Sequence, residues 1–426
     1  MNQEAERDKA EMKSYAERVT GPIVYAYVDW VISEAVRRGI TRLWFLARDG
    51  YLPYLVAREI CRARGIALEC RYFYCSRSSL RSSSYHLVDD DELSSYMFTR
   101  GYQTSAYTLF ARLGVGEEKR RELLLRANIE CADTPLGERD FSELCKCVRA
   151  DAEIFEGLRA SARDEYPRTV SYMRRVGFLE QDRVCIVDSG WTGSIQRSLR
   201  ILLDSLGYGG KIIGFYFGMY RDGRAEDGEY LTYYFSSRKG LFRRVFFNNN
   251  VFESMLSAPH PMTRGYAMYG GVSTPLFACD HDPYMLGLIS SQISGVLAFC
   301  KRINVETPRK RKAEINRRAV FRKARSVMVF PRCSEVRLFS RFYFCDDFTE
   351  QYKASLADES MKSRLRDNML IPRVMSRILR RRKYGSELFW SYGVVAYLPA
   401  YQRPWYRMNL LAWDFIKALR AFVGGS

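Results

Sequence analysis

Two short apolar runs, each followed by a polar loop that contains glycine, constrain the fold of this chain most. Residues 43–47 (LWFLA) lead into an Arg-Asp-Gly loop at residues 48–50, and residues 184–187 (VCIV) lead into a loop at residues 188–194. Apolar runs of about four to eight residues between turn signals are typical of strands that are buried on both faces of a parallel sheet. We therefore expect each loop to lie at the carboxyl end of a buried strand.

A helical pattern follows each loop, and a second strand pattern follows each helix. The helices are expected at residues 51–64 and 195–206, and the strands after them at residues 68–75 and 211–220. The order strand, loop, helix, strand is typical of a parallel βαβ unit. Two such units predict an α/β fold with a doubly wound parallel sheet, whose ligands bind at the carboxyl edge of the strands.

The chain has 426 residues, enough for one large domain with additions. Short charged helical segments interrupt the two units and predict a helical insertion, and the end of the chain is basic, aromatic and helical in pattern. The expected parts are the first part of the α/β core with a charged leader helix (1–84), the helical insertion (85–176), the second part of the core (177–275) and a basic helical C-terminal region (276–426).

The net charge of +18 favours anionic partners such as nucleic acid, acidic lipid or phosphorylated substrates. No apolar run reaches the roughly eighteen residues that span a bilayer, and the first residues are polar, so we expect a cytoplasmic protein. A basic run at residues 377–383 precedes an aromatic-rich tail at residues 388–423. This tail is expected either to pack on the core or to lie peripherally on the inner face of the membrane.

Cysteine and histidine usage argues against disulfides and zinc. The eleven cysteines are irregularly spaced, and the only close pair, Cys145 and Cys147, is separated by one residue. The three histidines, His86, His260 and His281, are far apart in the sequence. We expect reduced thiols and no zinc site.

The loop at residues 188–194 has the composition of an anion-binding site. Its glycines let the backbone approach a phosphate, the N–H groups at the start of the next helix point towards it, and hydroxyl side chains add donors. Asp188, at the end of the strand, is placed to accept hydrogen bonds from sugar hydroxyls. The candidate substrate-binding residues of this loop are Ser189, Gly190, Trp191, Thr192, Gly193 and Ser194.

The glycine spacing of this loop favours neither NAD nor ATP. It is not the dinucleotide fingerprint, and no lysine follows the second glycine as a Walker loop requires. The alternative to a ligand site is a tight turn in which Thr192 caps the following helix.

The first loop adds groups that suit a phosphorylated sugar donor. Arg48 is a candidate clamp for a pyrophosphate, and Asp49 is a candidate either to hold Mg²⁺ or to orient Arg48. Gly50 opens the helix, and Ser76 and Arg77 follow the next strand at the same expected edge. The alternative is an Arg–Asp pair that seals the turn without a ligand.

This arrangement resembles the type I phosphoribosyltransferase fold. In that family one loop cradles the pyrophosphate of phosphoribosyl pyrophosphate, and an acidic strand end with a Thr-Gly-rich turn holds the ribose and its 5-phosphate. The family motif usually has two adjacent acids before the turn, whereas this chain has Asp188 and Ser189. The resemblance implies phosphoribosyl pyrophosphate as the donor.

Most of residues 20–275 is also similar to a set of bacterial polysaccharide-locus proteins, in which this segment commonly follows a haloacid-dehalogenase-like hydrolase domain. The resemblance implies a glycosyltransferase of surface polysaccharide biosynthesis that transfers a phosphoribosyl group to a glycan or lipid-linked glycan acceptor. A separate phosphatase would later expose the ribofuranose. The shared motifs are FLARDGY (45–51), YCSR (74–77), VDSGWTGSIQ (187–196) and SAPH (257–260).

In such a reaction Mg²⁺, Arg48 and Arg77 would stabilise the charge that develops on the departing pyrophosphate. The acceptor hydroxyl needs a base. The candidates for this base are Asp49, Asp188, Glu253 and His260. For Glu253 and His260 the alternative is a structural role, in a helix end followed by a proline-stiffened turn.

Two other functions remain open from the sequence. Residues 276–282 (LFACDHD) resemble the strand and Asp-x-Asp motif of a haloacid-dehalogenase-like phosphatase, with Asp280 as the nucleophile. The positive charge and interleaved tyrosines and arginines also fit a non-catalytic module that binds nucleic acid or a membrane surface.

Overall fold

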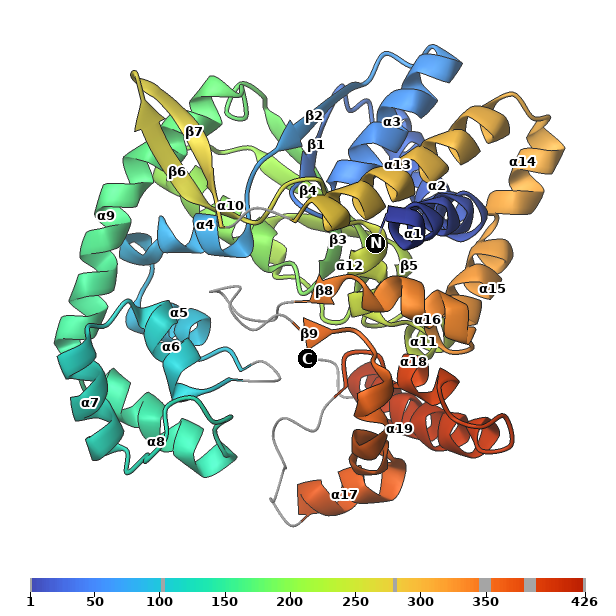
Figure 1. Ribbon diagram of the computed structural model, residues 1–426. Helices are drawn as coiled ribbons and strands as arrows, with labels where there is room; N and C mark the ends of the chain where they lie inside the picture. The colour runs from blue at the N-terminus through green and yellow to red at the C-terminus, as the bar shows by residue number, and fades with distance from the viewer. Residues whose placement is uncertain (1, 101–103, 279–281, 345–353, 379–387, 424–426) are drawn as a thin grey trace.

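The centre of the protein is a five-stranded parallel sheet with the strand order β2-β1-β3-β4-β5 (Figure 1). This computed structural model describes residues 2–100, 104–278, 282–344, 354–378 and 388–423. The strands of the sheet are β1 (Arg42–Leu46), β2 (Glu69–Phe73), β3 (Arg183–Trp191), β4 (Lys211–Met219) and β5 (Glu229–Phe235).

The strand order reverses between β1 and β3. The chain places β2 on one side of β1, then returns to place β3, β4 and β5 in turn on the other side. The predicted α/β fold with a parallel sheet is therefore confirmed. The reversal is the topological switch point at which open parallel sheets bind their ligands.

Helices cover both faces of the sheet, because alternate strand residues point in opposite directions. Phe45 and Val187 belong to the cluster that includes α2 (Gly21–Arg37) and α3 (Tyr51–Arg64). Trp44 and Ile186 belong to the cluster on the other face, which draws on α9 (Ala152–Arg175) and α10 (Ser194–Ser205).

Several strands differ from the sequence-based expectation. β3 continues through Trp191, although its loop was expected to begin at residue 188, and β5 was not predicted. The predicted boundary at residue 275 falls inside an antiparallel hairpin of β6 (Thr263–Tyr269) and β7 (Val272–Phe277). Gly270 and Gly271 form its turn with φ of 55° and 81°, values that favour glycine.

The segment between β2 and β3 is helical. The segment begins with α4 (Arg77–Ser82). The helices that follow it, together with the N-terminal part of α9, enclose a separate hydrophobic cluster. The C-terminal part of α9 packs against the sheet, where Tyr172 and Met173 are buried. The other elements of this segment are η2 (Tyr85–Leu87), α5 (Asp90–Met97), α6 (Ala106–Leu113), α7 (Glu117–Arg126) and α8 (Glu138–Arg149).

The leader is one continuous helical rod. α1 (Asn2–Tyr15) passes through the π-helical turn η1 (Ala16–Thr20) directly into α2. α13 (Pro283–Asn304) packs against this rod and against α3.

α13 is the one helix in the described part of the chain that is long and apolar enough to cross a membrane by composition, with a mean hydropathy of 1.3. A Cβ atom at Gly295 of α13 would collide with the carbonyl oxygen of Lys13, so the two helices cross in close contact. Its apolar residues Leu288, Val296 and Phe299 are buried in the core.

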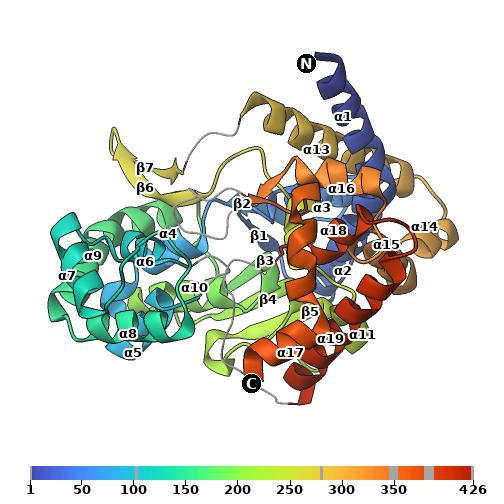
Figure 2. The same ribbon diagram turned by 60° about the horizontal axis from the view of Figure 1, so that its bottom comes forward.

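Residues 388–396 pack on the core. The indole N–H of Trp390 donates to the carbonyl of Met328. The side-chain amides of Asn248 and Asn250 both donate to the carbonyl of Phe389; Asn250 lies on α12 (Asn249–Met255), and Asn248 is the N-cap of that helix. Figure 2 shows the C-terminal helices and the helices of the 85–175 segment on opposite sides of the molecule. The remaining elements are η3 (Ala225–Asp227), α11 (Leu241–Val245), α14 (Pro308–Ile315), α15 (Arg317–Met328), α16 (Cys333–Ser340), β8 (Tyr343–Phe344), β9 (Ala354–Ser355), η4 (Glu359–Asn368), α17 (Leu370–Ile378), α18 (Ser391–Ala396) and α19 (Arg403–Val423).

Candidate functional site

The two predicted loops meet at the switch point of the sheet. β1 and β3 pair in parallel, with Phe45 opposite Val187, so their carboxyl ends lie side by side. The hydroxyl of Ser189 donates a hydrogen bond to the carboxylate of Asp49. The backbone N–H of Ser189 donates to Oδ1 of Asp188 at 2.9 Å. One serine thus connects both predicted acids.

The loop after β1 is a tight turn. The N–H of Gly50 donates to the carbonyl of Leu46 at 2.8 Å, and the N–H of Tyr51 donates to the carbonyl of Arg48 at 2.9 Å. A Cβ atom at Gly50 would collide with the Leu46 backbone, which explains the glycine. The Ala47–Arg48 peptide bond is cis. Because the Gly50 N–H is used within the turn, Gly50 shapes the loop and does not donate to a ligand.

The end of β3 and the turn that follows it contain residues with positive φ. Gly190 has φ of 112°, Trp191 of 80° and Gly193 of 70°, and Trp191 is one of the two non-glycine residues of this kind in the described ranges. Gly193, rather than Thr192, is the N-cap of α10, and no side chain caps this helix. The backbone N–H groups of the first turn, which begins at Ser194, are therefore suitably placed for an anion.

Trp191 is an internal anchor and not an exposed ligand contact. Its side chain is 8% exposed, and its ring packs with the rings of Tyr220, Phe235, Phe247 and Phe252. Its indole N–H donates to Oε1 of Glu253 at 2.6 Å. Trp191 consequently brings Glu253, which lies on α12, to the β3 loop.

Three carboxyl groups and two guanidinium groups share this edge of the sheet. The pKa of Asp188 is raised to about 7 and that of Glu253 to about 8. In both cases burial is the largest cause and the negative charge of Asp49 is the second largest. Burial also raises the pKa of Asp49 itself, while Arg48 and Arg77 lower it. Such a group of acids with raised pKa values is typical of a site that handles protons or cations.

The donor set suits magnesium that is shared with a substrate. No group of three or more His, Cys, Asp or Glu side chains in the part of the chain that the structure describes is arranged to hold a metal ion by itself. Mg²⁺ commonly binds one or two carboxylates and completes its shell with water and phosphate oxygens. Asp49, a half-buried carboxylate beside Asp188, fits that role.

Ser76 and Arg77 have different roles although they are neighbours. The hydroxyl of Ser76 donates to the carbonyl of Thr263 at 2.7 Å and accepts the N–H of Ser79 at 3.0 Å, so it caps α4 and anchors β6. Arg77 is exposed, and its charge lowers the pKa of all three carboxyl groups of the site. Of this pair, Arg77 is the residue placed to meet an anion.

His260 lies in an aromatic cluster at the end of β2. Its Nε2 is 2.7 Å from the hydroxyl of Tyr72, and its Nδ1 is 2.8 Å from the carbonyl oxygen of Pro261. Both ring nitrogens are engaged, which favours a role in binding over a role as the base. The rings that contact His260 are those of Tyr51, Tyr72, Tyr74 and Phe277.

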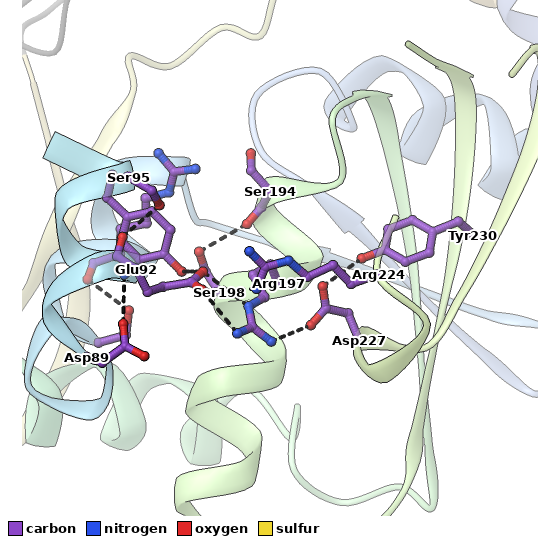
Figure 3. A network of polar contacts seen from close by, with 12 residues as sticks. Asp89, Glu92, Ser95, Ser194, Arg197, Ser198, Arg224, Asp227 and Tyr230 are labelled. Atoms are coloured by element: carbon purple, nitrogen blue, oxygen red, sulfur yellow. Dashed lines mark hydrogen bonds and ion pairs between the residues drawn. The ribbon is translucent and has the colours of Figure 1, made fainter. Parts of the chain in front are cut away.

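An ion-pair network that was not predicted from the sequence connects α10 to its neighbouring elements (Figure 3). Arg197 pairs with Asp227 at 2.8 Å and with both carboxylate oxygens of Glu92, each at 3.3 Å. Arg224 also pairs with Glu92, at 3.0 Å. The network joins α5, α10 and the turn before β5, and therefore fixes the helix that follows the β3 loop.

The phosphatase motif has an unsuitable setting. Cys279, Asp280 and His281 lie outside the described residues, and Asp282 accepts the N–H of Met285 at 2.9 Å as the N-cap of α13. β7, the strand before the motif, pairs only with β6 among the described strands and does not join the parallel sheet. This arrangement gives the phosphatase no support.

Comparison with known proteins adds no assignment. No protein-family model matches the chain, and no curated protein matches its sequence.

Proposed function

We propose that this protein is a glycosyltransferase that transfers a phosphoribosyl group from phosphoribosyl pyrophosphate to a glycan acceptor in surface polysaccharide biosynthesis. The observation that carries the proposal is the joining of Asp49 and Asp188 through Ser189 at the switch point of the sheet. The charges of Arg48 and Arg77 both act on Asp49, and that of Arg77 also acts on Asp188. Carboxylates for sugar hydroxyls and guanidinium groups for phosphates together match a phosphorylated sugar.

Each end of the donor has a matching part of the site. The guanidinium groups of Arg48 and Arg77 would bind the pyrophosphate, and the uncapped first turn of α10 at Ser194 would bind the 5-phosphate. Asp188, at the carboxyl end of the same sheet, would accept hydrogen bonds from the ribose hydroxyls. Mg²⁺ on Asp49 would neutralise part of the pyrophosphate charge.

The transfer needs a base rather than a protein nucleophile. The oxygen of the acceptor hydroxyl forms a bond to C1 of the ribose while the bond from C1 to the pyrophosphate oxygen breaks, and the electron pair leaves with pyrophosphate. The acceptor proton passes to Asp188, whose pKa of about 7 suits a base at neutral pH. Arg48 and Arg77 stabilise the charge on the leaving group.

The aromatic cluster suits the acceptor. Tyr74 lies 4.9 Å from His260 and 5.7 Å from Phe277 between ring centroids, and Phe277 is 41% exposed. Partly exposed rings beside polar groups are common in sites for organic ligands, and the apolar faces of sugar rings stack on them. A glycan or lipid-linked glycan would lie there, and a separate phosphatase would remove the 5-phosphate afterwards. The proposal includes a cytoplasmic location for this reaction.

Donor binding is the direct test. Phosphoribosyl pyrophosphate with Mg²⁺ is expected to raise the melting temperature, while ribose 5-phosphate or pyrophosphate alone raises it less. Arg48→Ala and Asp188→Ala should each abolish the shift. The matched controls are Arg62→Ala on α3 and Asp204→Ala on α10, whose side chains are 69% and 61% exposed, and these variants should keep the shift.

Two results would contradict the proposal. One is a folded protein whose melting temperature does not change at millimolar donor. The other is nucleic-acid binding that falls steeply with salt and is unaffected by Arg48→Ala and Asp188→Ala, because that pattern belongs to a non-catalytic binding module.

A further inference from the structure

The last helix of the chain exposes a continuous apolar stripe. Each side chain of the stripe is between 39% and 57% exposed, although all are large and apolar. They recur at intervals of three, four or seven residues, which places them on one face of the helix. The stripe of α19 consists of Trp405, Met408, Phe415, Leu419 and Phe422.

Neighbouring elements extend this apolar surface. Phe242 of α11 is 67% exposed, and its ring centroid lies 6.5 Å from that of Phe415. α17 also packs beside α19, and its Ile371 and Met375 are exposed. Exposed apolar surface of this extent is typical of an interaction site.

The charge of α19 is almost entirely positive. Its basic residues are Arg403, Arg407, Lys417 and Arg420, and its one acid, Asp414, accepts a hydrogen bond from the hydroxyl of Tyr392 at 2.7 Å. Lys417 and Arg420 are exposed. A helix with Trp, Phe and Leu on one face and basic residues elsewhere has the composition of an interfacial membrane helix.

We propose that the α19 stripe, with Phe242, binds the surface of a membrane that contains anionic lipids. Charge complementarity favours this occupant over a second copy of the chain, because two copies would bring basic helices together in a protein whose net charge is +18. The apolar stripe would enter the headgroup region, and Lys417 and Arg420 would meet the phosphates.

The helix is firmly joined to the catalytic part of the fold. Tyr392 of α18 holds Asp414 of α19, and the carbonyl of the nearby Phe389 accepts hydrogen bonds from Asn248 and Asn250. Asn250 lies on α12, the helix that carries Glu253. Membrane binding through α19 would therefore fix the orientation of the whole molecule at the bilayer. This inference does not depend on the proposed transferase activity.

Vesicle sedimentation tests the inference with the full chain. We expect strong binding to vesicles of phosphatidylcholine and phosphatidylglycerol in equal parts, weak binding to phosphatidylcholine alone, and weaker binding at high ionic strength. The double variant Trp405→Glu/Phe415→Glu should lower the affinity about tenfold or more, since two large apolar side chains no longer enter the interface. Lys417→Glu/Arg420→Glu should lower binding to the anionic vesicles only.

The matched control is Leu125→Glu on α7, an exposed apolar residue that is 82% exposed and lies outside the stripe. This variant should bind as the unaltered protein does, and thermal melting shows that each variant is folded. Equal binding by all variants would overturn the inference. So would the absence of vesicle binding together with a dimer, seen by light scattering, that Trp405→Glu/Phe415→Glu dissociates.

Discussion

The hydroxyl of Ser189 donates a hydrogen bond to the carboxylate of Asp49, across the boundary between the two strands at which the sheet reverses its order. If the loop is of the proposed phosphoribosyltransferase type, Ser189 occupies a position at which that motif usually has an acid. A second acid at this position would repel Asp49, because both carboxylates carry a negative charge. The serine instead stabilises the ionised form of Asp49, since its hydrogen bond lowers the pKa of that group.

Ser189→Ala is therefore expected to weaken donor binding without unfolding the protein. Loss of this hydrogen bond, worth about 1 kcal/mol, should weaken binding of phosphoribosyl pyrophosphate with Mg²⁺ by about fivefold in a calorimetric titration. Ser95→Ala on α5, where the hydroxyl donates to the carbonyl of Glu92, is the control and should leave the affinity unchanged. Unchanged affinity in Ser189→Ala would show that the two loops do not act together.

The pH dependence of the reaction should follow Asp188. A base must be deprotonated to accept the acceptor proton, so kcat/KM is expected to rise with pH through an apparent pKa of about 7. Asp188→Asn should lower kcat/KM by about 100-fold or more and remove this rise. Asp204→Asn, further along α10, should leave the profile as it is. A rise that persists in Asp188→Asn would assign the base to another group.

The parallel sheet and its two loops could be predicted because the sequence signal is local. β1 and the first half of β3 are continuous apolar runs, since both faces of these strands are covered by helices. Once two parallel strands are assigned, their loops must share an edge. For this reason the approach of Asp49 to Ser189, separated by 140 residues, was predictable.

Other parts of the site could not be predicted because their signal is tertiary. Glu253 is brought to the site by its hydrogen bond with the indole of Trp191. No sequence pattern indicates that these two residues are in contact. β5 was not predicted; it is an edge strand of the sheet, and only its last three residues are buried. The β6–β7 hairpin does have a local signal, the Gly270–Gly271 pair, but its outward apolar residues obscure the alternation expected of a strand.

Glu253→Gln is expected to stabilise the protein at high pH. The pKa of Glu253 is about 8 in the folded state and near its ordinary value of 4.5 when unfolded, so the folded state binds the extra proton between these values. The contribution of Glu253 to stability is thus greatest below pH 4.5 and is lost as the pH rises through about 8.

A glutamine in its place still accepts the hydrogen bond of Trp191 and carries no charge. Chemical unfolding at pH 9 should show an increase of about 1 kcal/mol or more in the free energy of unfolding, and little change at pH 5. Glu118→Gln, at an exposed position on α7, is the control and should have no such pH-dependent effect. Equal stability of Glu253→Gln and the unaltered protein at pH 9 would contradict this prediction.

The network of Glu92, Arg197, Arg224 and Asp227 is expected to stabilise the fold at every physiological pH. Burial alone would raise the pKa of Glu92, but hydrogen bonds from Arg197, Tyr96 and Arg224 lower it to about 2. Its stabilising contribution is complete above the ordinary value of 4.5 and is lost only as the pH falls towards about 2. Glu92 therefore holds α5 against α10 under all ordinary conditions.

Glu92→Ala leaves the guanidinium groups of Arg197 and Arg224 without their shared carboxylate, and we expect it to lower the free energy of unfolding by about 1–3 kcal/mol. In the double variant Glu92→Ala/Arg224→Ala, the loss should be smaller than the sum of the two single losses, because both single variants break the same ion pair. Hydrogen exchange of Glu92→Ala should become faster in α5 and at the start of α10, while the exchange of α3, on the opposite face of the sheet, is unchanged. Additive losses, or equally fast exchange in α3, would mean that the network does not connect the helical segment to the β3 loop.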